Sequence, residues 1–412
     1  MLVQAKLNRD IFFWVLYQFA LGMLLSPFVI CFPLYVSHYL VAPGQDPKAI
    51  LFIIWGLSNV FSTLVTPYFG MYLDVKHTHR FWLIIMTVVI VILFPLLHQV
   101  FPSSHYLLDY IIIIVMLNMV GACLRILLNT VMLDIIPEQS MGRISHFGFA
   151  GVVLGAILGL MYSSIGSGVK AHFEHVTLYF PIWFFFLTVG LILVYRHRAP
   201  ASLSSGRVWK KSNLFTLGIL NLYQNYPEAF KLIVTKGLLF GGFLGLVIVF
   251  PFYIHHKFHF TEQQIVELYF LATIFFFISS LLFGIVVRWF NEKFLLFFVV
   301  LVAWLISIAI VLCDNRDWFI VLFCILSWFA SPMLSLIRSL FLNYIPASVM
   351  GVAFGGGDTI AKLLYLLGPV SYFIIKSFTP HDGIALLSTF FTTPLGLILL
   401  LYCKKHDEQS SV

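Results

Sequence analysis

The sequence predicts an all-α membrane protein with twelve transmembrane helices in two parallel six-helix halves. Three observations carry this prediction: the composition, the spacing of the apolar segments, and an internal repeat. Of the 412 residues, 61% are apolar and only 10% are charged, and the mean hydropathy is +0.99. A soluble domain carries about 25% charged residues. This composition excludes a soluble enzyme, a secreted disulfide-rich domain and a disordered protein.

Twelve segments meet the length of a membrane-crossing helix, which needs about 20 mostly apolar residues. Helices are expected because they satisfy every backbone group internally, and because runs such as 111–119 lack the alternation of barrel strands. The first segment is too long for a cleaved signal peptide. The expected segments are 11–40, 49–71, 81–100, 110–134, 145–165 and 177–196, then 232–254, 264–287, 294–313, 318–342, 352–376 and 384–403.

A polar stretch divides the chain midway, which predicts an N-terminal half (1–196), a cytoplasmic linker (197–230) and a C-terminal half (231–412). An internal repeat supports the division. Ile136-Pro137 recurs as Ile345-Pro346, and Met141-Gly142 recurs as Met350-Gly351, in both cases 209 positions later. Because six spans is an even number, the two repeats enter the membrane the same way round.

The distribution of basic residues predicts the orientation of the chain. Sixteen of the 24 Lys and Arg residues fall in one set of connections and termini, and five fall in the opposite set. The positive-inside rule therefore places both termini in the cytoplasm of a multi-pass protein of the inner (plasma) membrane. The net charge of +7 follows from these loops. Nucleic-acid binding is not expected, because no basic run with interleaved aromatic residues occurs.

Charged residues inside the spans are the candidates for a substrate cavity, because a charge in mid-membrane is costly unless it is paired or faces a cavity. Asp358 and Lys362 are spaced i, i+4 and share a helix face. They are interpreted either as a cavity-lining pair that meets substrate or a proton, or as an intrahelical salt bridge. Arg125 can bind a carboxylate or phosphate bidentately. The polar residues of the first and fourth spans either line the same cavity or bond between helices: Gln18, Asn118 and Asn129.

A second group of residues lies at the predicted cytoplasmic ends of the spans. After the second span, Gly70 permits close helix approach, and Asp74 and Arg80 can latch the cytoplasmic ends; the alternative is an ordinary charged loop. Asp134 and Arg143 are expected to act in the same gate. Arg338 either belongs to this gate or extends toward the interface. A separate stripe of Gly151, Gly155 and Gly159 predicts close helix packing by the fifth span.

No catalytic motif is present, so an enzyme is not expected. Gly355-Gly356-Gly357 opens a membrane helix without a preceding strand and is not a dinucleotide fingerprint. The five cysteines form no CxxC pair, and neither they nor the histidines have metal-ligand spacing. The sequence therefore predicts no metal and no cofactor.

The spans, the central loop and the Gly70, Asp74, Lys76, Arg80 turn resemble the major facilitator superfamily. The second half is similar to the vacuolar amino-acid effluxer-like family, whose bacterial members are termed "unknown major facilitator" proteins. The residues that carry this similarity are Ser335, Arg338, Ser339, Phe341, Ile345, Pro346, Phe354, Gly355, Asp358, Lys362, Gly368 and Pro369. In the first span, Trp14, Leu16, Tyr17, Phe19 and Ala20 resemble the same family.

The resemblance implies a secondary transporter that moves a small organic solute, with amino acids as one class, across the bilayer by alternating access. We expect a monomer that binds its substrate near the bilayer midplane between the halves. Proton coupling is a hypothesis that rests on Asp358, Lys362 and Asp134. Two alternatives remain open: a transporter of a larger metabolite such as a siderophore, and a membrane scaffold without transport activity.

Overall fold

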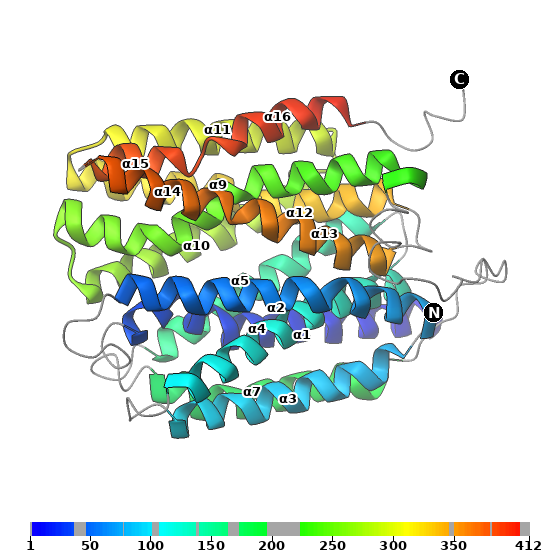
Figure 1. Cartoon of the computed structure of the whole chain (residues 1–412). Helices are drawn as coiled ribbons and strands as arrows, with labels where there is room; N and C mark the ends of the chain where they lie inside the picture. Colours follow the sequence, from blue (N-terminus) through cyan, green and yellow to red (C-terminus); the bar gives the residue numbers. More distant parts are fainter. Residues whose placement is uncertain are drawn as a thin grey trace. The chain divides into compact units, whose positions relative to one another are not determined.

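The computed structural model describes residues 2–36, 47–76, 78–100, 107–136, 140–163, 173–195, 223–345, 350–379 and 381–403. Within these ranges the regular secondary structure is helical and no strand occurs (Figure 1). Most of the expected linker, Pro137 and Pro346 lie outside the described residues. The all-helical class predicted from the sequence agrees with this architecture.

Every expected segment coincides with a helix or with two consecutive helices, although many helices extend beyond the apolar run. The helices are α1 (Leu2–Tyr35), α2 (Pro47–Lys76), α3 (His79–Val100), α4 (Leu107–Ile135), α5 (Met141–Ser163), η4 (His175–Tyr179), α7 (Phe180–Val194), α9 (Pro227–Phe258), α10 (Glu262–Val286), α11 (Glu292–Leu312), α12 (Arg316–Tyr344), α13 (Met350–Tyr365), α14 (Leu367–Phe378), α15 (Asp382–Ser388) and α16 (Thr392–Tyr402).

Among the described residues, ten helical stretches are long and apolar enough to cross a membrane. Three of the ten combine consecutive helices: η4 with α7, α13 with α14, and α15 with α16. The expected spans 49–71 and 232–254 lie on α2 and α9, which contain 30 and 32 residues but are not among the ten. The chain is thus a multi-pass membrane protein by the length and composition of its helices, and the count of twelve crossings stays a prediction.

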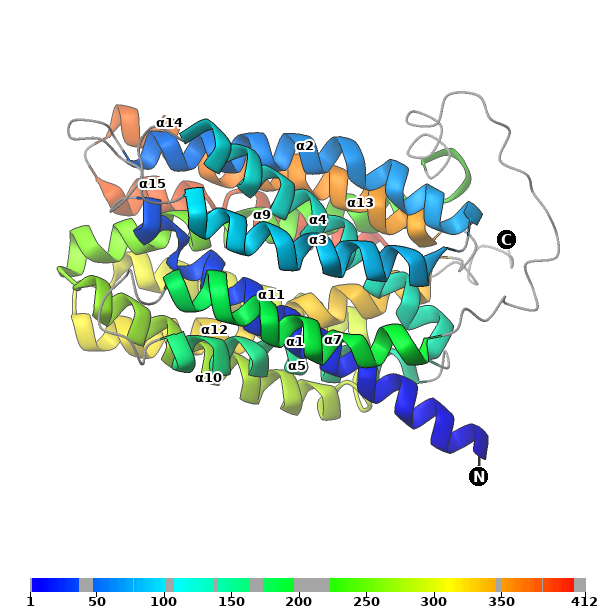
Figure 2. The same cartoon turned by 90° about the horizontal axis from the view of Figure 1, so that it is seen from below.

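The helices form two compact units, and the first contains Met1–Met141, Leu154–Gln224 and Pro346–Thr359. In this unit α2 packs on α4, α3 packs on α4 and α7, and α1 packs on α7. Figures 1 and 2 both show α3 beside α7. The unit takes in the first part of α13 and lacks the beginning of α5, and the predicted division at 1–196 stays a prediction.

The second unit contains Gly142–Val153, Asn225–Ile345 and Ile360–Val412, so it includes the beginning of α5. Here α12 packs on α10 and α11, α16 packs on α9, and α14 packs on α9 and α15. Contacts between aromatic rings join α9 to α12. The ring centroids of Phe250 and Phe323 are 5.0 Å apart, and those of Phe258 and Phe319 are 4.4 Å apart.

The buried aromatic residues of α1 fix the interior of the first unit. The indole Nε1 of Trp14 donates a hydrogen bond of 3.0 Å to the carbonyl of Leu128 on α4. The hydroxyl of Tyr17 lies 2.7 Å from that of Thr87 on α3. Both aromatic side chains are fully buried, and a buried Tyr or Trp requires such a partner for its polar atom. These bonds therefore set the rotation of α1 against α3 and α4.

Part of the glycine stripe predicted for the fifth span packs against α1, in agreement with the packing interpretation. A Cβ on Gly155 would collide with the backbone carbonyl of Phe19. A Cβ on Gly159 would lie 2.6 Å from the carbonyl oxygen of Met23. The absence of side chains at these positions lets the two helix backbones approach closely.

We expect Gly155→Ala to lower the melting temperature of the purified protein, because the added methyl group meets backbone rather than a side chain that can rotate. Overpacking of this kind costs about 1–3 kcal/mol. Gly56→Ala on α2 is the matched control, since its Cβ would meet no atom within 4 Å. The control should leave the melting temperature unchanged or raise it, because Ala favours a helix over Gly by about 0.5–1 kcal/mol. Equal melting temperatures for the two variants would contradict the packing argument.

Candidate functional site

The carboxylate of Asp74 binds the N-terminus of α13 within the first unit. The backbone N–H groups of Gly351 and Val352 each donate a hydrogen bond of 2.9 Å, one to each carboxylate oxygen. The first N–H groups of a helix lack partners within the helix, and the helix dipole favours a negative charge there. Asp74 satisfies both requirements for α13 from the end of α2.

Close approach of the α2 and α13 backbones makes this bond possible. A Cβ on Gly70 would collide with the carbonyl of Gly351, and a Cβ on Gly355 would collide with the carbonyl of Thr66. One turn beyond Gly355, the hydroxyl of Thr359 donates a 3.0 Å hydrogen bond to the carbonyl of Thr63. Gly70 therefore lets α2 and α13 approach closely, and Asp74 lies one turn further along the same helix; their part in a gate stays a prediction.

Burial raises the pKa of the Asp74 carboxyl to about 7, although the two backbone N–H groups of Val352 and Gly351 act in the opposite direction. Asp74 lies beyond the apolar part of α2, at the end that the sequence predicts to be cytoplasmic. Its protonation state therefore changes near neutral pH.

The helix bound by Asp74 also carries the two charged residues predicted for the cavity. Asp358 is half-buried and Lys362 is 7% exposed. Asp358 lies seven residues after Gly351, which corresponds to about 10 Å along a helix axis. Asp358 lies in the first unit together with Asp74, whereas Lys362 lies in the second.

The other predicted cavity residues lie in the first unit, on α1 and α4. Asn118, Arg125 and Asn129 are spaced i, i+7 and i+11, so they form one stripe along α4. Arg125 is exposed and the two asparagines are half-buried. Gln18 on α1 is 4% exposed. The stripe is consistent with a polar face for solute, and the function of these residues stays a prediction.

Two of the predicted gate residues bind α7 or the residue after it, in the first unit. The Nε atom of Arg80 donates a 3.0 Å hydrogen bond to the carbonyl of Ile192. Asp134 accepts a hydrogen bond from the hydroxyl of Tyr195. Arg80 and Asp74 thus bind different helices and are not an ion pair.

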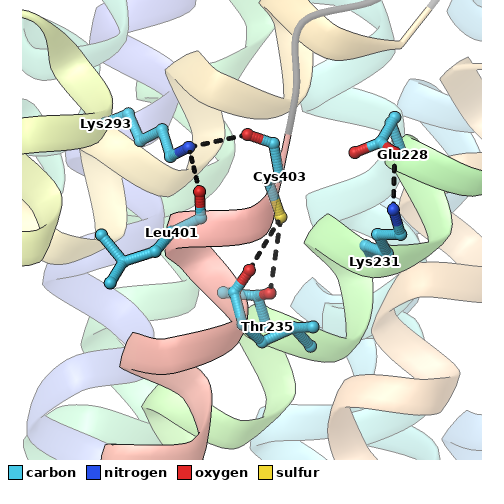
Figure 3. Close-up of polar contacts among 7 residues, drawn as sticks. Glu228, Lys231, Thr235, Lys293, Leu401 and Cys403 are labelled. Carbon is cyan, nitrogen blue, oxygen red and sulfur yellow. Dashed lines mark hydrogen bonds and ion pairs between the residues drawn. The ribbon is translucent and has the colours of Figure 1, made fainter.

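A matching basic residue lies at the start of α11 in the second unit. Lys293 donates hydrogen bonds of 2.8 and 2.7 Å to the carbonyls of Leu401 and Cys403 at the end of α16 (Figure 3). The acceptors Ile192 and Leu401 differ by 209 positions, the same offset as the sequence repeat. A cation at a helix C-terminus is favoured by the helix dipole. Arg80 and Lys293 therefore cap corresponding helix ends, although the two basic residues are themselves 213 positions apart.

The second unit contains a polar cluster at the beginning of α5. A Cβ on Gly142 would lie 2.8 Å from both Oε1 of Glu292 and Oγ of Ser339. Ser339 donates a 2.6 Å hydrogen bond to the same Glu292 oxygen. Gly142 is the repeat equivalent of Gly351, so a carboxylate lies near the beginning of both helices.

The remaining two predicted gate residues lie in this second unit. The guanidinium of Arg143 is exposed and lies 5.5 Å from the centre of the Phe147 ring. Arg338 has a buried Nη1 atom. Sequence reasoning did not identify His146, whose Nδ1 lies 2.8 Å from the hydroxyl of Ser335. No group of three metal-ligating side chains occurs in the described part of the chain.

We expect the thermal stability of the protein to depend on pH through Asp74. Its pKa in the folded chain is about 7, against 3.8 for a solvated carboxyl, so the folded chain binds a proton more tightly. Stability from this group is fully present below the lower value and is lost as the pH rises through the higher one. The melting temperature of the wild type should therefore fall relative to that of Asp74→Asn between pH 5 and pH 8.

Asp109→Asn is the control for this measurement, because Asp109 is an exposed aspartate at the other end of the membrane helices. Its pH profile should match that of the wild type. A constant difference between wild type and Asp74→Asn across the pH range would contradict the assignment.

The fold resembles those of solved membrane transporters, whereas no family model and no curated protein sequence matches the chain. The human organic anion transporter MFSD10 (TETRAN) superposes with a TM-score of 0.77 at 13% identity, over 96% of this chain and 99% of that one. The major facilitator superfamily proton:xylose symporter XylE gives 0.72 at 13% identity, over 97% and 96% of the two chains. A bacterial homologue of the iron transporter ferroportin gives 0.71 at 14% identity, over 99% and 100%. The chain therefore has the major facilitator superfamily fold that its sequence predicts.

Proposed function

We propose that the protein is a secondary active transporter that moves a small organic solute across the inner membrane by alternating access. The solved structures of the same fold support transport as the function class, because they are an organic anion transporter, a proton:xylose symporter and an iron transporter homologue. These three proteins are named for different solutes, so the substrate class is argued from the residues of this chain. The proposal includes the division into halves at 1–196 and 231–412 and cytoplasmic termini.

The observation that carries the proposal is the bond between Asp74 and the N-terminus of α13. It joins a helix of the N-terminal half to the helix that carries Asp358 and Lys362. Water molecules can replace the two backbone N–H groups as hydrogen-bond donors to this carboxylate. The contact can therefore break and form again. Rocking of the halves needs such a reversible contact at one end of the helices.

The proposed gate consists of residues with different partners. Asp74 and Gly70 hold α13 against α2. Arg80 and Asp134 keep the end of the first half together through Ile192 and Tyr195. In the second unit we assign Arg143 and Arg338 to the same end of the molecule.

The proposed substrate contacts are the polar stripe of α4 and the charged residues of α13. Arg125 is suited to a carboxylate, and Asp358 with Lys362 is suited to an ammonium group and a proton. Together these charges match the two ends of an amino acid, which is the class that the sequence resemblance implies. Gln18, Asn118 and Asn129 would supply neutral hydrogen bonds. We propose that Asp358 takes up the coupling proton.

The test is solute accumulation in proteoliposomes under an imposed pH gradient, after a thermal-shift screen of amino acids and other small organic solutes has identified a ligand. Asp358→Asn should reduce gradient-driven accumulation at least tenfold, because the amide cannot carry a proton. Exchange of solute in the absence of a gradient should persist. Asp109→Asn is the matched control and should accumulate solute as the wild type does, because Asp109 is exposed near the start of α4.

Two results would overturn this proposal in different ways. Gradient-driven accumulation by Asp358→Asn at the wild-type rate would exclude the proton role. A protein that is stabilised by no small solute and exchanges none would favour the alternatives, a transporter for a larger metabolite such as a siderophore or a scaffold.

A further inference from the structure

The short turn between α10 and α11 in the second unit exposes large aromatic rings. Trp289 is 72% exposed and Phe290 is 52% exposed, and Phe294 in the first turn of α11 is 60% exposed. Turns between helices usually consist of small and polar residues. Exposed apolar groups that gather at one place mark a surface that contacts a partner or a membrane.

The backbone of this turn is hydrogen-bonded on both sides. The N–H of Arg288 donates a 3.2 Å hydrogen bond to the carbonyl of Ile285, and that of Trp289 donates a 3.0 Å bond to Val286. On the other side, the side chain of Asn291 caps α11 by accepting hydrogen bonds from the first backbone N–H groups of the helix. The exposure of the two neighbouring rings is thus a feature of an ordered turn.

The rings continue the apolar faces of the two helices that the turn connects. One exposed face of α10 consists of Leu271, Ile278, Leu282 and Ile285, and one of α11 consists of Phe294, Phe298, Leu305 and Leu312. The spacing within each set places its members on one side of a helix. Gln263–Val286 also has the smallest buried share of the ten membrane-crossing stretches. The turn therefore lies where the lipid-facing surface of α10 and α11 ends.

The corresponding connection of the first repeat lacks the aromatic pair. Between α2 and α3 the chain reads Lys-His-Thr-His over 76–79 and contains no Trp, Tyr or Phe. The two repeats share only the next ring, because Phe81 and Phe294 are each the third residue of their helix and are 56% and 60% exposed. The fold therefore does not require Trp289 and Phe290, and their exposure calls for a function specific to the second repeat.

Of the charged residues around this turn, one is left without a protein partner. Glu292 accepts the 2.6 Å hydrogen bond from Ser339. Lys293 donates to the carbonyls at the end of α16. Arg288 is exposed, and its side chain forms no hydrogen bond or ion pair with the residues that the structure describes. The turn thus presents a free guanidinium directly before the two aromatic residues.

This combination matches the chemistry of an anionic phospholipid. Trp is enriched at the boundary between headgroups and acyl chains, because its ring is apolar and its N–H is polar. A guanidinium binds a phosphate group bidentately, and basic residues next to the bilayer are attracted to anionic lipids. A free phosphate ion would contact only the guanidinium and would leave the rings in water, so a lipid accounts for more of the surface.

We propose that the α10–α11 turn, with Arg288, Trp289, Phe290 and Phe294, is a binding surface for anionic phospholipid in the adjoining leaflet. The rings enter the interface between headgroups and acyl chains, and Arg288 binds the lipid phosphate. The distribution of Lys and Arg predicts that this leaflet is the cytoplasmic one. The proposal does not depend on which solute the protein transports.

The experiment measures how brominated lipids quench the fluorescence of Trp289 in the full-length protein in nanodiscs. Because the chain contains nine tryptophans, the Trp289 component is the difference between the wild type and Trp289→Phe. One series contains phosphatidylcholine with a fixed fraction of phosphatidylcholine that is brominated near the glycerol end of its acyl chains. The other contains the same fraction of equally brominated phosphatidylglycerol. We expect quenching in both series, at least twofold stronger with phosphatidylglycerol.

Arg288→Gln, measured against its own Trp289→Phe reference, should make the two series equal, because it removes the charge and keeps the rings. Arg288→Lys keeps the charge without the bidentate geometry and should retain a reduced preference for phosphatidylglycerol. Arg316→Gln is the matched control at the opposite end of the membrane helices. Its exposed guanidinium lies 4.1 Å from the centre of the Phe260 ring, and its removal should leave the preference unchanged.

The proposal is overturned if neither brominated lipid quenches the Trp289 component, the result expected when the rings contact water or another protein. It is equally overturned if the wild type shows no preference for phosphatidylglycerol, or if Arg288→Gln keeps that preference in full. Since the readout is lipid contact rather than solute movement, each of these outcomes leaves the proposed transport function to be judged by its own experiment.

Discussion

The first unit depends on one charge-assisted contact, the two hydrogen bonds that the backbone of α13 donates to Asp74. The contact requires glycine at two levels, because side chains at Gly70 or Gly355 would separate the α2 and α13 backbones. Two physical effects act against each other at this contact. The field at the helix terminus favours the charged carboxylate, and burial disfavours it. A group balanced in this way responds to small changes in its surroundings, which is what a reversible gate needs.

Most of the fold could be predicted from the sequence, because lipid permits few architectures and hydropathy reports the helices directly. The candidate functional site was predicted less completely, because its residues were identified without their bonding partners. Spacing alone singled out Gly70, Asp74 and Arg80, but it did not indicate their partners: Asp74 binds the N-terminus of α13 and Arg80 binds Ile192. The cluster around His146 gave no signal, because a single histidine and scattered serines have no spacing rule. Their proximity arises from the register of α5 on α12, which hydropathy does not encode.

The repeated Met-Gly motif at the start of α5 and of α13 has a different environment in each unit. At Gly351 the carboxylate comes from the end of α2, and it binds the helix backbone directly. At Gly142 a carboxylate from the start of α11 lies near the helix and is held by Ser339. The repeat therefore preserves the place of the negative charge and changes the helix that supplies it.

The bonds from Arg80 to Ile192 and from Lys293 to Leu401 each begin and end within one sequence repeat. A bond of this kind needs nothing from the other repeat. Arg80 can thus hold the start of α3 to the end of α7, and Lys293 the start of α11 to the end of α16, with residues of its own repeat alone.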